Sequence, residues 1–280
     1  MTELRARMIE DMELHGYAPR TREVYVNAVR LLAEHYGRSP DRLTEDNLRR
    51  YFFYLRDERG LADSTIRVRF HAIKFFFRKT LHRPWRVLDI IRVKRRKRLP
   101  IVLSRQEVHA LLKHMRQPVA RMVSLLLYGC GLRVSEATHL RAEHIDRPRR
   151  VLTVRNGKRG KDRCLPLPQR LLDALTDYWR QHRPKCWLFP DRRGLKPIPR
   201  ATVRQAIYRA AKDAGLQKRP SCHTLRHCFA THLLEQGIDL RVLQGLMGHA
   251  SLRSTAVYLH LTQATRQTAR DAVEALAAHL

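Results

Sequence analysis

His223-Thr-Leu-Arg226-His227-Cys-Phe-Ala-Thr-His232 is a run that carries polar side chains at helical spacing. His223, Arg226 and His227 stand at i, i+3 and i+4, which share one face of a helix. His223 and Arg226 can therefore address the same phosphate, whose oxygens suit an arginine fork. The His223/His227 pair also has the spacing of half a zinc site. The glutamate of a zinc-protease motif is missing and no third ligand is evident, so a structural role is the alternative for His227.

A second arginine lies earlier, in Gly129-Cys-Gly131-Leu-Arg133-Val-Ser-Glu136. The glycines permit a tight turn into a helix, so Arg133 can present its guanidinium to two phosphate oxygens. Glu136, one helical turn on, can pair with Arg133 and fix its rotamer. The alternative is an ordinary surface ion pair, which contributes little to stability.

The run Asn156-Gly-Lys158-Arg-Gly-Lys161-Asp-Arg163 joins two β-prone segments, 151–154 and 164–167. Its Asn-Gly step predicts a β-hairpin with Lys158 at the tip. A lysine on such a tip can reach into a cleft and act as a general acid. The alternatives are a solvated turn lysine and Lys161 in the same role.

Two further polar residues follow, His249 after Leu246-Met-Gly248 and Tyr258 nine positions later. Gly248 lets the backbone turn, so the imidazole of His249 can face the same cleft. A lone tyrosine between Val and Leu is commonly a packed core residue. A phenol with its ordinary pKa of about 10 is a poor nucleophile, but neighbouring cations lower that pKa and stabilise charge developing on phosphorus.

The charge of the chain points to a polyanionic partner. Fifty-six Lys and Arg against 26 Asp and Glu give 280 residues a formal net charge of +30 and a pI near 11.1. Such a field predicts strongly salt-dependent binding to nucleic acid, and solubility alone needs far less charge. The five cysteines are odd in number and form no Cys-x-x-Cys pair, which argues against a disulfide framework and against a Cys-based zinc site, and fits a reducing compartment. The polar N-terminus and the lack of a long apolar run predict a soluble cytoplasmic protein.

Hydrophobic periodicity predicts a mainly α-helical chain with a small β-hairpin or sheet. Residues 1–88 form a four-helix domain, in which Tyr25, Val29, Leu32 and Tyr36 make one apolar stripe. Thr44 caps one helix of this domain, and Asp63 or Ser64 caps another. Residues 89–103 form a basic linker. Residues 104–280 form a mixed α+β domain that opens on the capping box Ser104-Arg-Gln-Glu107. Its later helices are predicted at about 168–182, 200–214, 223–236, 239–247 and 262–279.

Six of these polar residues form the candidate site for attack on a phosphodiester: Arg133, Lys158, His223, Arg226, His249 and Tyr258. Basic residues outside this set are candidates for contact with a phosphate backbone. For the linker run, a solvated stretch of like charges is the alternative. The predicted DNA-binding residues are Arg67, Arg69, Lys74, Arg78, Lys94, Arg95, Lys161, Arg163 and Arg204.

Taken together, these motifs resemble the tyrosine recombinase (phage integrase) family. The strong resemblance runs from about 104 to 262, and the N-terminal helices resemble the family's SAM-like core-binding domain. The resemblance implies that Tyr258 attacks the scissile phosphate and forms a 3′-phosphotyrosyl link. It assigns the remaining roles as follows: Arg133 and Arg226 hold the non-bridging oxygens, Lys158 protonates the leaving 5′ oxygen, His223 assists proton transfer from the tyrosine, and His249 hydrogen-bonds the phosphate.

The resemblance also implies that neither a metal nor another cofactor is required. It implies a C-shaped clamp on double-stranded DNA and a homotetramer on two recombination sites, with or without a related recombinase. The short N-terminus leaves no room for an arm-binding domain, as in Xer-like, integron-type and transposon-borne members. The biological outcome is then integration, excision, resolution or transposition of a mobile element, at the bacterial-type nucleoid.

Two other functions stay open at this point. A type IB topoisomerase uses related chemistry without strand exchange. A degenerate recombinase kept as a DNA-binding regulator would be catalytically idle, although the complete set of six polar residues argues against it.

Overall fold

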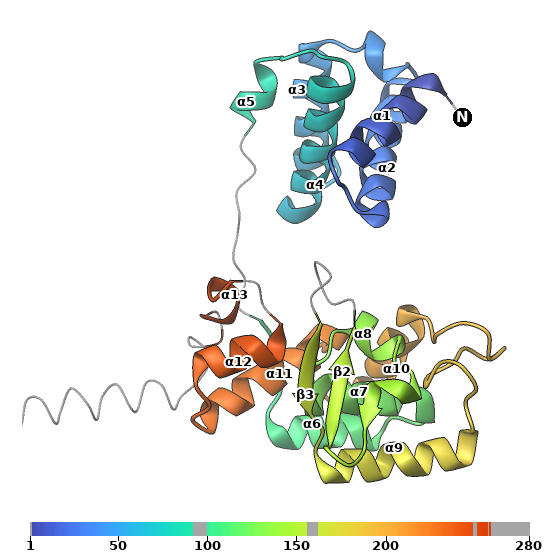
Figure 1. The fold of residues 1–280 in the computed structure, drawn as a ribbon. Coiled ribbons are helices and arrows are strands. Elements are labelled where there is room, and N and C mark those ends of the chain that lie inside the picture. Colours follow the sequence, from blue (N-terminus) through green and yellow to red (C-terminus); the bar gives the residue numbers. More distant parts are fainter. Residues whose placement is uncertain (1, 92–99, 156–161, 249–250, 257, 259–280) are drawn as a thin grey trace, which may run out of the picture. The chain divides into compact units, whose positions relative to one another are not determined.

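The computed structural model describes residues 2–91, 100–155, 162–248, 251–256 and 258 (Figure 1). The chain divides into two compact units, Met1–Arg98 and Leu99–Leu280. Each unit is helical for most of its described length, and the second also contains a small sheet. The predicted fold class, mainly α with a small β element, is therefore confirmed.

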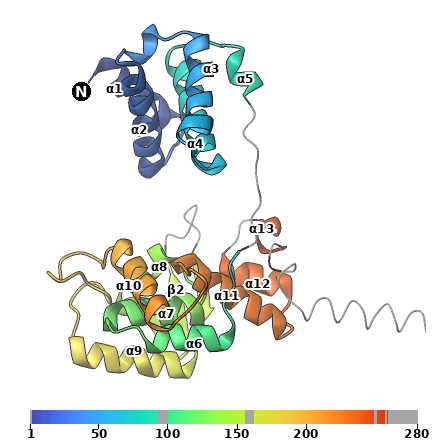
Figure 2. The same cartoon turned by 180° about the vertical axis from the view of Figure 1, so that it is seen from behind.

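The first unit is a bundle of four helices followed by a short fifth (Figures 1 and 2). Its elements are α1 (Glu3–Leu14), α2 (Pro19–Tyr36), η1 (Pro40–Arg42), α3 (Glu45–Phe53), η2 (Tyr54–Glu58), α4 (Asp63–Phe75), η3 (Phe76–Thr80) and α5 (Val87–Ile90). The segments η2 and η3 are π-helical continuations of α3 and α4.

Local signals decide where these helices begin and end. Gly37, in the left-handed region at φ 57°, ends α2. Thr44 caps α3 as predicted: its hydroxyl accepts from the Asn47 amide at 3.3 Å, and the Asn47 side chain accepts from the Thr44 amide at 2.9 Å. The predicted cap of α4 at Asp63 or Ser64 is wrong. The N-cap is Ala62, and Asp63 is instead a helical residue in the first turn, where its charge suits the helix dipole.

The apolar stripe of α2 packs into the core of this unit. Val29 and Leu32 are buried, and Tyr25 and Tyr36 pack against the same cluster. The core extends into α5, where Leu88 is fully buried. The predicted start of the linker, residue 89, thus falls inside α5, and residues 92–99 lie outside the described part of the chain. The linker assignment stays a prediction.

The second unit surrounds the apolar helix α7 (Pro118–Gly129). The other elements of this unit are α6 (Arg105–Lys113), α8 (Val134–Thr138), η4 (Ala142–His144), β1 (Ile145–Asp146), β2 (Val151–Val154), β3 (Arg163–Pro166), α9 (Gln169–His182), α10 (Arg200–Asp213), α11 (Cys222–Glu235), α12 (Leu240–Met247) and α13 (Arg253–Ala256). The four helices predicted between residues 168 and 247 are confirmed within one or two residues at each end. The helix predicted at 262–279 lies outside the described residues.

The two strands predicted at 151–154 and 164–167 are present, the first with the predicted bounds. The strands β2 and β3 pair antiparallel, with Val151 opposite Pro166 and Val154 opposite Arg163. The second strand begins one residue earlier than predicted. The two-residue strand β1, which was not predicted, pairs with the other edge of β2 to give the order β1-β2-β3.

Helix α11 lies in the interior of this unit, with α7 on one side and α12 on another (Figure 1). Leu225, Cys228 and Ala230 on α11 are fully buried. The Ser104 capping box that starts α6 is present as predicted, with the Ser104 hydroxyl accepting from the Glu107 amide at 3.1 Å. Among the residues described, no helix is both long enough and apolar enough to cross a membrane.

Candidate active site

Arg133 is held at the start of α8 by Glu136. The Arg133 amide donates to Glu136 Oε2 at 2.8 Å, and its Nη1 donates to Oε1 at 2.7 Å. The predicted i, i+3 pairing is therefore present. It is not an ordinary surface pair, because the Glu136 side chain is only 8% exposed.

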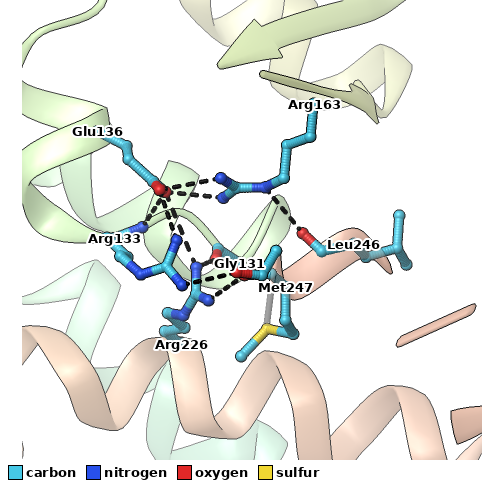
Figure 3. Close-up of polar contacts among 8 residues, drawn as sticks. Gly131, Arg133, Glu136, Arg163, Arg226, Leu246 and Met247 are labelled. Carbon is cyan, nitrogen blue, oxygen red and sulfur yellow. Dashed lines mark hydrogen bonds and ion pairs between the residues drawn. The ribbon is translucent and has the colours of Figure 1, made fainter. Parts of the chain in front are cut away.

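Glu136 also accepts hydrogen bonds from a second arginine, Arg163, which comes from a different element (Figure 3). Arg163, on β3, donates through Nη1 and Nη2 at 2.9 and 2.7 Å, and Arg226 Nη1 lies 3.8 Å from Oε2. Burial raises the pKa of Glu136, but hydrogen bonds from Arg163 and Arg133 outweigh burial and lower it to about 2. One ionised carboxylate thus gathers three guanidiniums, which leaves the cluster with two net positive charges.

Arg226 enters this cluster from the buried face of α11. Its side chain donates to the backbone carbonyls of Gly131 and Met247 (Figure 3). Burial, followed by Arg133, lowers the pKa of Arg226 to about 9, while Glu136 opposes the shift. The group therefore stays cationic at neutral pH. A buried cation of this kind is stabilised by an anion placed beside it.

Two glycine turns bring backbone carbonyls to the arginines. Gly131 has a φ of 61°, and a Cβ on it would lie 2.4 Å from the ring of Phe229. Gly248, at φ 58°, ends α12, and its carbonyl accepts from Arg133 Nη2 at 3.0 Å. Arg163 Nε donates at 3.2 Å to the carbonyl of Leu246. The arginines therefore connect the turn before α8, the strand β3 and the end of α12.

Tyr258 lies beside this cluster and is 2% exposed. Its ring packs with apolar side chains of α11 and α12, which are Ala230, Leu234, Leu243 and Met247. Burial raises the pKa of Tyr258, and Arg226 and Arg133 oppose the shift. This packing is that of a core tyrosine, the alternative that the sequence left open. The phenol nevertheless lies close enough to both arginines for their charges to oppose the rise in its pKa.

The hydroxyl of Tyr258 contacts His227. Nδ1 of His227 lies 2.8 Å from the phenol oxygen, and the two ring centroids are 5.5 Å apart. Burial, then His223 and Arg226, lower the pKa of His227 to about 4, so the imidazole is neutral at neutral pH. From the sequence, a structural role was the alternative to half a zinc site for His227, and no catalytic role was predicted. Its position one turn from His223 was the signal that it shares the face of the site.

The structure brings together only part of the predicted set. Arg133, Glu136 and Arg226 form one cluster, and Tyr258 lies within range of the charges of Arg133 and Arg226. His223, at the start of α11, stays partly open to solvent, and burial together with Arg226 and Arg133 lowers its pKa. Other predicted residues lie outside the described part of the chain; these are Lys158, His249, Lys94, Arg95 and Lys161.

The predicted DNA-binding residues that the structure describes differ in their surroundings. Arg204 is exposed on α10, whereas the side chain of Arg163 is 11% exposed and paired with Glu136. This pairing favours a positioning role for Arg163 over a phosphate contact. In the first unit, Arg67 and Arg69 are half-buried on α4. Lys74 and Arg78 both pair with Asp89.

No group of three or more His, Cys, Asp or Glu side chains arranged to hold a metal ion occurs among the residues that the structure describes. All five cysteines lie within the described residues, and each is a free thiol. The arrangement is that of a cationic cluster next to a buried phenol. It can bind an anion and place it near an oxygen nucleophile.

Comparison with known proteins identifies the family of the chain. The model of the phage integrase family matches residues 101–265, and that of the phage integrase N-terminal SAM-like domain matches residues 4–87. A putative integrase/recombinase of Sinorhizobium fredii, y4qK, is 42% identical over 262 residues, covering 93% of this chain and 85% of its own. The tyrosine recombinase XerA of Pyrococcus furiosus is 34% identical over 281 residues, with 97% and 94% covered.

Solved structures show the same fold. The crystal structure of XerA recombinase is 28% identical, has a TM-score of 0.56 and covers 96% of this chain and 97% of its own. The Tn1549 transposon integrase in complex with circular intermediate DNA is 20% identical, with a TM-score of 0.74 and coverage of 98% and 99%. The chain therefore belongs to the phage integrase family and is a tyrosine recombinase, an enzyme that transfers DNA strands in site-specific recombination.

Proposed function

We propose that Tyr258 is the nucleophile and that Arg133 and Arg226 hold the scissile phosphate. The single observation that carries this proposal is the buried phenol of Tyr258 within the electrostatic field of both arginines: burial raises the pKa of the phenol, and Arg226 and Arg133 oppose that rise. In the attack, the phenol oxygen bonds to phosphorus as the bond to the 5′ oxygen breaks, which leaves a 3′-phosphotyrosyl link and a 5′-hydroxyl. The two net positive charges of the cluster offset the charge that develops on the phosphate.

Other residues have roles that rest on the family resemblance. Lys158 would protonate the leaving 5′ oxygen and His249 would hydrogen-bond the phosphate, and both lie outside the described residues. The resemblance assigns proton transfer from the tyrosine to His223. Because the phosphotyrosyl bond conserves the energy of the broken bond, a 5′-hydroxyl of a partner duplex can attack it without ATP.

The assembly and the place of action are part of the proposal. Two double-stranded DNA sites would be held by four copies of the chain, with or without a related recombinase, and the two units would clamp the duplex. The neighbours solved with DNA, among them the Tn1549 integrase with transposon right end DNA, support a DNA substrate. We place the reaction at the nucleoid of a bacterial-type cell.

Covalent trapping tests the proposal. The recombination site is first obtained by crosslinking the protein to DNA in cells and sequencing the bound fragments. Duplexes with a nick beside the cleavage point then trap the covalent adduct, which is seen on a denaturing gel. We expect an adduct with the wild type and none with Tyr258→Phe, which should keep its DNA affinity.

Tyr208→Phe is the matched control, because Tyr208 is 59% exposed on α10. It should trap like the wild type. A wild-type protein that binds the site and never forms the adduct would contradict the proposal and favour a DNA-binding regulator. An adduct that relaxes supercoils but never joins two sites would favour a topoisomerase.

A further inference from the structure

The hydroxyl of Tyr258 is buried against one imidazole. Tyr258 is 2% exposed, and its oxygen lies 2.8 Å from Nδ1 of His227. That distance is within the range in which a proton passes directly between two heavy atoms. His223, to which the resemblance assigns the same proton, lies one turn away on α11, with its ring centroid 6.3 Å from that of His227.

The protonation state of His227 decides which of the two groups donates the hydrogen bond. A neutral imidazole carries one proton, on either Nδ1 or Nε2. When the proton is on Nε2, the lone pair of Nδ1 faces the phenol and the phenol donates to it. Burial, then His223 and Arg226, hold the pKa of His227 near 4, so the neutral form dominates at neutral pH. The imidazole is thus able to accept a proton at the point where the nucleophile must lose one.

We propose that His227, rather than His223, takes the proton of Tyr258 during attack on the scissile phosphate. This inference rests on the proposed role of Tyr258 as the nucleophile. The proton moves from the phenol oxygen to Nδ1 of His227 while that oxygen bonds to phosphorus. The electron pair of the broken bond stays on the 5′ oxygen, which takes a proton from the general acid. In the reverse reaction, the imidazolium returns its proton to the departing phenol oxygen.

The charges around His227 couple this step to DNA binding. Arg226 is one of the groups that disfavour a charged His227, and it also holds the proposed phosphate. A bound phosphodiester adds a negative charge beside Arg226 and reduces this repulsion. Burial still opposes the imidazolium, so the proton moves in the course of the attack rather than before it. Without DNA, His227 is a poor base and Tyr258 stays protonated.

The competing explanation is that His227 only holds the phenol in place. Substitution by asparagine separates the two roles, because its carboxamide oxygen can accept the phenol's hydrogen bond but does not take up a proton. If His227 only positions the phenol, His227→Asn should keep its cleavage activity. If His227 is the base, His227→Asn should lose that activity. His227→Ala leaves space for free imidazole, which can replace a missing base. His114→Asn is the matched control, since the exposed His114 bonds through Nδ1 to the Ala110 carbonyl.

The experiment is single-turnover cleavage of a duplex with sulfur in place of the scissile 5′ oxygen. A thiolate leaves without protonation, so the rate reports activation of the nucleophile alone. We expect His227→Asn to cleave on the order of 10²- to 10⁴-fold more slowly than the wild type, the usual contribution of a general base. His114→Asn should be unchanged and His223→Asn should be affected less than His227→Asn. Added imidazole should accelerate His227→Ala.

The outcomes separate this inference from the proposed function. If the wild type forms the adduct and His227→Asn forms it equally fast, or faster, the base role is overturned while Tyr258 remains the nucleophile. If the wild type forms no adduct, the proposed function itself fails. Thermal unfolding midpoints and DNA affinities close to the wild type show that a slow variant is folded. If His227→Ala is folded and cleaves slowly, and added imidazole does not raise its cleavage rate, the proposal is also overturned.

Discussion

Arg163 on β3 donates two parallel hydrogen bonds to Glu136 on α8, at 2.9 and 2.7 Å, across 27 residues of sequence. The same carboxylate holds Arg133 and lies 3.8 Å from Arg226. Glu136 is thus the counter-charge that allows three guanidiniums to share a small volume. Its removal would leave the cations to repel one another in a site with little access to water.

Glu136→Gln should destabilise the second unit and disorder the cluster. Removing one partner of a buried ion pair leaves charge uncompensated and typically costs about 3 to 5 kcal/mol. We expect the free energy of unfolding in urea to fall by that amount and DNA cleavage to be lost. Glu143→Gln is the control, because Glu143 is exposed and lies 3.8 Å from Arg141. Equal effects of the two substitutions would contradict the proposed role of Glu136.

The ionisation of Glu136 also predicts how stability depends on pH. The pKa is lowered from 4.5 to about 2 on folding, so the stabilisation is complete above 4.5 and is lost as pH falls towards 2. The loss over this window is about 3 kcal/mol, at 1.36 kcal/mol for each pKa unit. Unfolding free energies measured from pH 5 to 2 should therefore fall more steeply for the wild type than for Glu136→Gln. Parallel curves for the two proteins would show that Glu136 is not linked to folding in this way.

The turn at Gly131 supplies another test. Both Gly131 and Gly215 have positive φ, 61° and 67°, but only at Gly131 does an added Cβ meet a side chain, the Phe229 ring at 2.4 Å. Gly215→Ala should cost about 1 kcal/mol for the left-handed conformation alone. Gly131→Ala should add about 1 to 3 kcal/mol for overpacking and should slow cleavage, because the Gly131 carbonyl accepts from Arg226. Urea unfolding compares the two variants, and equal losses would mean that Phe229 moves aside without cost.

Much of the fold was predictable because its signals are local. Gly37, Thr44 and the Ser104 capping box mark helix ends through groups within four residues. The hairpin followed from the two β-prone segments, 151–154 and 164–167, and from the Asn156-Gly157 step between them. The π-helical ends of α3 and α4 and the two-residue strand β1 were not predictable, because packing rather than local sequence decides them.

The candidate site was predictable as a set of residues but not as a network. The Arg133–Glu136 pair is visible at i, i+3, whereas the bonds from Arg163 and Arg226 to the same region join distant segments. Arg163 was predicted to contact DNA because it is basic, and its position beside the predicted strand does not reveal that its side chain meets a buried carboxylate. The contact of His227 with Tyr258 spans 31 residues and depends on how α11 and the segment after α13 pack.

Two cations predicted to contact DNA share one carboxylate in the first unit. Lys74 Nζ lies 3.1 Å from Asp89, and Arg78 also pairs with it. The Asp89 side chain is 60% exposed, and exposed pairs of this kind contribute little to stability, so a DNA phosphate can compete for both cations. Asp89→Asn should therefore raise affinity for a generic duplex, because it removes the competing charge.

The salt dependence of binding measures whether these cations reach phosphates. Each phosphate contact contributes about −0.9 to the slope of log K against log salt concentration. Lys74→Gln and Arg78→Gln should therefore each flatten that slope by roughly this amount. Arg20→Gln is the charge-matched control, since Arg20 is 85% exposed and pairs with Glu23 on α2. If Lys74→Gln and Arg78→Gln change the slope no more than Arg20→Gln does, the two cations serve only to hold α5 against α4 through Asp89. Their predicted contact with DNA would then be wrong.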